Sequence, residues 1–125
     1  MAKSAADLVA EARARVDNLR PEAVGSELTC GGAILVDIRE SDECETQGRI
    51  FGALHIPRGL LEFRSDPTLS SHQPPLHPSA RVILHYTSGL RSALAAVSLM
   101  ELGYDRVAHL DRGIDGWKAA DRTVV

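Results

Sequence analysis

The chain has 125 residues, of which 44% are hydrophobic and 25% charged, and its formal net charge is −3. This size and composition are typical of one soluble globular domain with a single core. Charges of both signs are interspersed, which argues against binding to nucleic acid or to an anionic membrane surface. No apolar run is long enough for a signal peptide or a membrane span, so we expect a cytoplasmic protein.

The two cysteines, Cys30 and Cys44, form neither a CxxC motif nor a cluster with histidines. This pattern predicts no disulfide framework, and the histidine spacing predicts no metal site. The sequence implies no cofactor.

The first predicted element is a helix at the N-terminus. Ser4 followed by Asp7 is typical of a capped helix start, and the apolar spacing indicates about three turns. We expect residues 1–17 to form a helical extension that packs on a domain of residues 18–125. Pro21 then opens a second helix, which Gly31 and Gly32 end.

Short apolar runs predict strands at residues 33–36, 53–56, 82–85 and 107–110. An Ala- and Leu-rich segment at 91–102, followed by Gly103, predicts a helix between the last two strands. This alternation favours parallel strands joined by right-handed crossovers. We therefore predict an α/β fold, with a central parallel five-stranded sheet and helices on both faces. Residues 65–79, rich in proline, predict a long surface loop.

The segment from Val82 to Ser92 carries the clearest chemical signal. It runs from an apolar strand through a tight turn directly into a helix. Successive N–H groups of such a turn converge, the helix N-terminus adds partial positive charge, and Gly89 allows close approach of the backbone. Arg91 could add a fork of charged donors. The segment therefore predicts a site for a small anion at the carboxyl ends of the strands.

Four stretches resemble, in order, the signatures of rhodanese-like sulfurtransferase domains: LVDIRE at 35–40, GRIFGALHIP at 48–57, SGLRS at 88–92 and DRGIDGW at 111–117. The resemblance covers roughly residues 18 to 120 and implies the rhodanese-like fold. Members of this family carry sulfur as a persulfide on a cysteine, the first residue of the loop, and pass it to a thiol or to cyanide. Arg49 and Phe51 depart from the family's usual histidine and proline.

The resemblance places Tyr86 at the position of the catalytic cysteine. A phenol with a pKa near 10 cannot form a persulfide and is a poor nucleophile at neutral pH. We therefore expect persulfide transfer to be absent or strongly impaired. Tyr86 could have a function, either filling the pocket or donating its hydroxyl to a ligand. Alternatively, it marks a lost catalytic position in a loop that still closes, and we favour this interpretation. The four residues between Tyr86 and Arg91 match sulfurtransferase loops, whereas related phosphatases have one more.

The candidate anion loop comprises Tyr86, Thr87, Ser88, Gly89, Leu90, Arg91 and Ser92, supported by Asp37, Arg39 and Glu43. We expect Arg91 to pair with Asp37 or to orient a ligand, because a lone buried charge is costly. Arg39 and Glu43 are expected to join this network. A role for Arg39 on the rim of the site is an alternative. By strand alternation, His85 should point away from Tyr86 as a hydrogen-bonded core histidine. Trp117 is interpreted as a core anchor.

Three functional hypotheses remain open. The first is a non-catalytic or regulatory module that binds a small sulfur-containing anion, a thiol or persulfide carrier, or an acidic group of an unknown protein partner. The second is a sulfurtransferase that uses Cys44 or Cys30 instead, although we expect Cys44 on the core face of a helix and Cys30 at an exposed, unreactive helix end. The third is a subunit scaffold.

Overall fold

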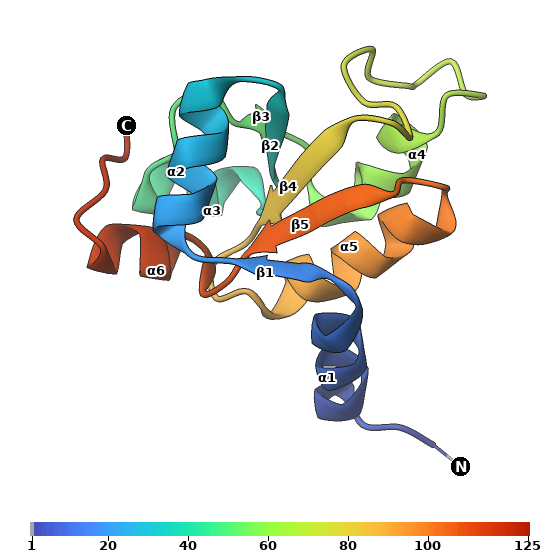
Figure 1. Cartoon of the computed structure of the whole chain (residues 1–125), viewed down its shortest axis with the longest axis horizontal. Helices are drawn as coiled ribbons and strands as arrows, with labels where there is room; N and C mark the ends of the chain where they lie inside the picture. The colour runs from blue at the N-terminus through green and yellow to red at the C-terminus, as the bar shows by residue number, and fades with distance from the viewer. Residues whose placement is uncertain (1) are drawn as a thin grey trace.

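The computed structural model describes residues 2–125, which form a parallel five-stranded sheet between two layers of helices (Figure 1). The strand order is β1-β5-β4-β2-β3, and all four neighbouring pairs are parallel. The strands are β1 (Asp17–Leu19), β2 (Ala33–Asp37), β3 (Leu54–His55), β4 (Arg81–His85) and β5 (Arg106–Leu110). The predicted α/β fold is confirmed.

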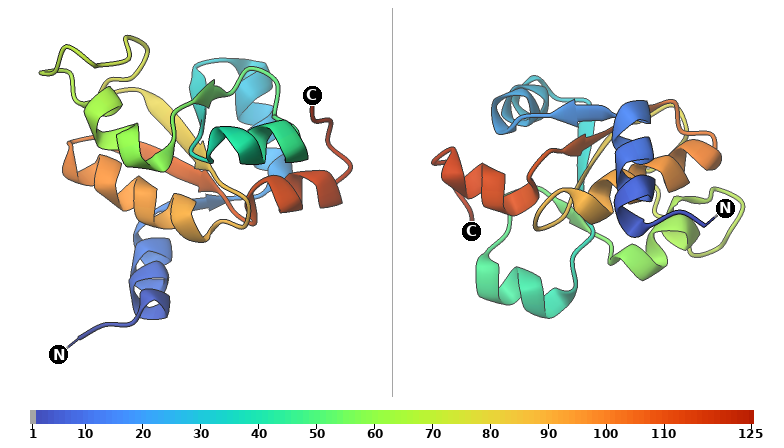
Figure 2. Two further views of the ribbon diagram at one scale, coloured as in Figure 1. Left: turned by 180° about the vertical axis from the view of Figure 1, so that it is seen from behind. Right: turned by 90° about the horizontal axis from the view of Figure 1, so that it is seen from below.

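Helices cover both faces of the sheet (Figure 2). One face carries α4 (Leu61–Ser65) and α5 (Leu90–Glu101), with α1 (Ala5–Arg15) packed against α5. The other carries α2 (Pro21–Cys30), α3 (Ser41–Gln47) and α6 (Gly113–Ala119). A short 3-10 helix, η1 (Arg58–Leu60), precedes α4. None of the helices within residues 2–125 is long and apolar enough to cross a bilayer.

The side chains of β4 show how the pleat builds two cores. Val82 and Leu84 face α4 and α5, whereas Ile83 faces α2 and α6. Alternation then directs His85 toward the α6 side, away from Tyr86, which packs against the α5-side core. Trp117 lies in the α6-side core, as predicted.

The N-terminal helix begins as its sequence predicts, because Ser4 and Asp7 form a reciprocal capping box. The strand that follows was not foreseen. β1 has three residues, of which only Leu19 is apolar, so it carries no run typical of a strand. Its pairing with β5, Asn18 opposite His109, makes it an edge strand.

The proline-rich segment forms the predicted long loop: residues 66–80 contain no helix or strand. Leu76 is nevertheless fully buried in the α5-side core and ties the loop to the domain.

Candidate functional site

The candidate anion loop (residues 86–92) leaves the carboxyl end of β4 and enters the first turn of α5. Gly89, the residue before α5, has a φ of 92°, a conformation that favours glycine. A Cβ atom at this position would lie 2.9 Å from the backbone nitrogen of Arg112. Gly89 is therefore required both by its own backbone and by the close approach of the segment before α6.

The backbone N–H groups and the carbonyls of the loop differ in their hydrogen bonding. Within residues 2–125, no acceptor lies in hydrogen-bonding geometry to the N–H groups of residues 87–92. The carbonyls are occupied instead: Tyr86 O accepts from Ile114 N at 2.8 Å, and Thr87 O accepts from Asp115 N at 3.2 Å. The N-terminus of α6 thus holds the loop by its oxygens and leaves a row of donors at the N-terminus of α5. Such a row can bind an anion.

Tyr86 and Arg91 contact each other in this loop. The guanidinium carbon of Arg91 lies 4.7 Å from the centre of the Tyr86 ring, a cation–π geometry. The predicted pairing of Arg91 with Asp37 is wrong. Arg91 is exposed, whereas Asp37 is buried and bound by Arg39. This leaves the Arg91 cation available at the surface of the loop.

Asp37 and Arg39 form a buried ion pair at the end of β2. Arg39 Nε and Nη2 donate to the two carboxylate oxygens of Asp37 at 3.0 and 2.8 Å, and Nη2 also donates to Gly48 O. Burial favours the neutral acid, but the bonds from Arg39 and the charge of His85 outweigh it and lower the pKa of Asp37 to about 2. Arg39 is fully buried in this pair, as expected for a member of a structural network, and therefore does not take the alternative position on the rim of the site.

Glu43 connects α3 to the candidate anion loop. One carboxylate oxygen accepts from Glu40 N at 3.0 Å in a helix cap, and the other lies 3.4 Å from the hydroxyl of Thr87. Its bonded partners are thus the helix start and the loop, not the Asp37 pair.

Cys44 and His85 both lie close to the same carboxylate oxygen of Asp37. The Cys44 thiol donates to Asp37 Oδ2 at 3.3 Å and is buried on the core face of α3, as predicted. Burial, with the charge and hydrogen bond of Asp37, raises the pKa of this thiol to about 11. His85 is buried too, and burial lowers its pKa to about 4 against the opposing charge of Asp37. Among residues 2–125 neither ring nitrogen of His85 has a hydrogen-bond partner, so the prediction of a hydrogen-bonded core histidine is wrong.

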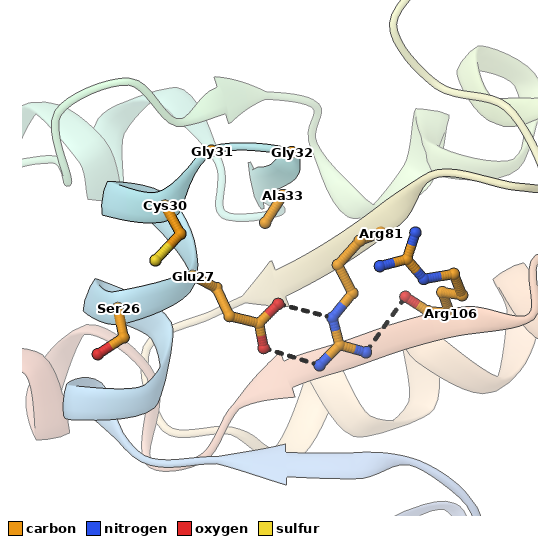
Figure 3. A pocket seen from close by; sticks show the side chains of 8 residues that line it. All are labelled: Ser26, Glu27, Cys30, Gly31, Gly32, Ala33, Arg81 and Arg106. Carbon is orange, nitrogen blue, oxygen red and sulfur yellow. Dashed lines mark hydrogen bonds and ion pairs between the residues drawn. The ribbon is translucent and has the colours of Figure 1, made fainter.

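Cys30 lies at the opposite end of the sheet from the loop. It lines a cavity of about 280 Å³ with Gly31, Gly32 and the first residues of β4 and β5, Arg81 and Arg106 (Figure 3). The Arg81 guanidinium is engaged by both carboxylate oxygens of Glu27 at 2.9 Å. Since the strands are parallel, their amino ends and the loop at their carboxyl ends cannot share a site.

A hydrogen-bond network behind the loop, which links the buried Ser92 and His109 to the exposed Asn18, has no signal in the sequence. The Ser92 hydroxyl lies 2.8 Å from His109 Nδ1, and His109 Nε2 lies 2.6 Å from Asn18 Oδ1. Ser92 was identified from its motif. Asn18 and His109 carry no local signal, because strand pairing alone brings them together.

Comparison with known proteins agrees with this fold and site. Residues 20–120 match the rhodanese-like domain family. A sulfurtransferase from Allochromatium vinosum is 36% identical over 84 residues, which make up 67% of this chain and 70% of that protein. The chain is therefore an α/β domain of the rhodanese-like family, which includes sulfurtransferases.

Solved structures extend the likeness to the whole chain. A protein of unknown function from Rhodopseudomonas palustris, described as a possible tyrosine phosphatase, matches with a TM-score of 0.92 and 28% identity over 100% of this chain and 96% of its own. The polysulfide-sulfur transferase of Wolinella succinogenes matches with a TM-score of 0.75 and 27% identity, covering 94% of this chain and 83% of that one. The thiosulfate sulfurtransferase of Pseudomonas aeruginosa matches with a TM-score of 0.78 and 28% identity, covering 97% of this chain but 22% of that larger protein.

Proposed function

We propose that this rhodanese-like domain binds a small sulfur-containing anion in the candidate anion loop and does not itself carry sulfur there. The observation that supports this proposal is the row of unbonded N–H groups at residues 87–92 beside the exposed cation of Arg91. These groups supply the donors and positive charge that an oxyanion such as thiosulfate requires. A persulfide or thiol-bearing carrier, or an acidic group of a protein partner, could offer the same chemistry.

The absence of sulfur transfer rests on Tyr86. We infer that Tyr86 stands where related sulfurtransferases place the cysteine that becomes a persulfide. A phenol oxygen cannot form that sulfur–sulfur bond, whatever anion the loop holds. The same side chain argues against a phosphatase that forms a covalent intermediate on this residue.

A sulfurtransferase that uses another cysteine is the second candidate, and the geometry of both thiols disfavours it. Cys44 is buried and its raised pKa keeps it as a thiol, whereas the thiolate is the nucleophile. Cys30 is exposed but lies at the amino ends of the strands.

The test is thiosulfate-to-cyanide sulfur transfer by the unchanged protein, by Tyr86→Cys and by Tyr86→Phe, with calorimetric binding of thiosulfate and sulfate to each. We expect anion binding by all three proteins and turnover by Tyr86→Cys alone. Turnover by the unchanged protein that is lost in Cys44→Ser would overturn the proposal in favour of Cys44; loss in Cys30→Ser would do so for Cys30. If neither anion binds, the loop is not an anion site.

A further inference from the structure

The orientation of Asn18 fixes the protons of the network behind the loop. Its Nδ2 donates to the carbonyls of Arg13 and Val16 at 2.9 and 3.2 Å, which turns Oδ1 toward His109. A carbonyl oxygen only accepts, so His109 Nε2 must carry the proton of their 2.6 Å hydrogen bond.

The hydroxyl of Ser92 must then donate to His109. Burial lowers the pKa of His109 to about 4, against the opposing charge of Asp111, so its ring is neutral near pH 7 and has one N–H. With the proton on Nε2, Nδ1 is an acceptor, and it lies 2.8 Å from Ser92 Oγ. The alternative acceptor for this hydroxyl, Gly89 O, is farther away at 3.2 Å. Both Ser92 and His109 are fully buried, so neither exchanges this bond for one to solvent.

We propose that Asn18 and His109 are positioning residues for the candidate anion loop, acting through the hydroxyl of Ser92. Ser92 belongs to the first turn of α5, whose free N–H groups form the donor row. The hydrogen bond from the Ser92 side chain to His109 of β5 therefore fixes the direction in which these N–H groups point. The inference rests on the proposed anion binding for its functional meaning, but not for its geometry.

The network also ties the loop to the N-terminal segment. The carbonyls that hold Asn18 belong to the last turn of α1 and to the residue after it. Arg13 of the same turn forms a bidentate pair with Asp111, at 2.5 and 3.1 Å, directly after β5. Docking of α1 therefore sets the orientation of Asn18, and through His109 that of Ser92.

Two substitutions of His109 separate positioning from general support of the fold. In His109→Asn the amide oxygen takes the place of Nδ1 and can still accept from Ser92, whereas in His109→Gln the amide takes the place of Nε2 and leaves Ser92 without its acceptor. Tyr104→Phe is the matched control, because it removes a buried hydrogen bond to Ser65 O away from the loop. Each variant is titrated with thiosulfate and with sulfate by calorimetry, after circular dichroism has shown that it is folded.

We expect the dissociation constants to rise about tenfold in His109→Gln, about threefold or less in His109→Asn, and not measurably in Tyr104→Phe, since one hydrogen bond is at stake. Equal weakening in the two His109 variants, or none in either, would overturn the proposal.

A second measurement needs no ligand and stands if His109→Gln fails to fold. In ¹⁵N NMR of the unchanged protein we expect His109 to carry its proton on Nε2, and in Asn18→Ala we expect loss of this single tautomer with shifted amide signals at residues 88–92. A proton on Nδ1, or loop signals as unchanged in Asn18→Ala as in Tyr104→Phe, would overturn it. If the unchanged protein binds neither anion, the proposed function fails, and these amide signals alone decide the positioning role.

Discussion

At the scale of single residues, the end of β2 is held by the buried ion pair between Asp37 and Arg39. Removing one partner of a buried ion pair leaves the other charge without compensation, which costs about 3–5 kcal/mol. We expect Asp37→Asn to lower the free energy of unfolding by about this amount in urea titration. Glu62→Gln is the control, since its pair with Arg58 is partly exposed and worth about 0.5 kcal/mol or less. A loss below about 1 kcal/mol in Asp37→Asn would contradict this account.

The two cysteines should differ sharply in reactivity. Cys30 is exposed, whereas Cys44 is buried with its pKa raised to about 11. We expect an aromatic disulfide reagent at pH 7 to modify Cys30 in the folded protein, at the ordinary rate of an exposed thiol, and Cys44 only after unfolding in urea. Fast reaction of the folded Cys30→Ser variant would show that Cys44 is accessible and would revive it as a sulfur carrier.

At the scale of the elements, α6 packs so closely against the candidate anion loop that Gly113 leaves no room for a side chain. Gly113 has a φ of 57°, and a Cβ atom there would lie 2.0 Å from Tyr86 O. We expect Gly113→Ala to destabilise the domain by about 2–5 kcal/mol, from backbone strain and overpacking together. Gly59→Ala is the control: nothing lies within 4 Å of its added Cβ, and a change within about 0.5 kcal/mol is expected in the same urea titration. Similar effects in the two variants would mean that α6 does not brace the loop.

For the molecule as a whole, two buried histidines predict a loss of stability in mild acid. Burial lowers the pKa values of His85 and His109 from 6.5 to about 4, so the unfolded chain binds these protons first as the pH falls. Their contribution is complete above pH 6.5 and disappears as the pH falls toward 4, with a slope of up to about 1.4 kcal/mol per pH unit for each histidine. Asp37 adds a loss only below its ordinary value of 3.8.

Urea titrations at several pH values between 4 and 7.5 measure this slope. Substituting His85 by Asn should remove about half of it, because one of the two protons is then no longer taken up on unfolding. A slope unchanged by His85→Asn would mean that this ring titrates normally in the folded protein.

Local sequence was sufficient for the features that depend on neighbours along the chain. The apolar runs predicted β2, β4 and β5, the Ser4–Asp7 pattern predicted the start of α1, and the alternation of strands and helices predicted the α/β fold with a turn between β4 and α5. Each of these rests on side-chain periodicity, on capping or on backbone conformation, which the local sequence encodes.

Only the tertiary structure decided which charged and polar groups meet. Asp37 pairs with Arg39 and not Arg91, because the two faces of the sheet separate Asp37 from the loop arginine. The polar strand β1 forms because β5 offers it an edge, and that pairing brings Asn18 to His109 and thus to Ser92. Burial then lowers the pKa of His109, since desolvation depends on all the elements that surround a group and not on its position in the sequence.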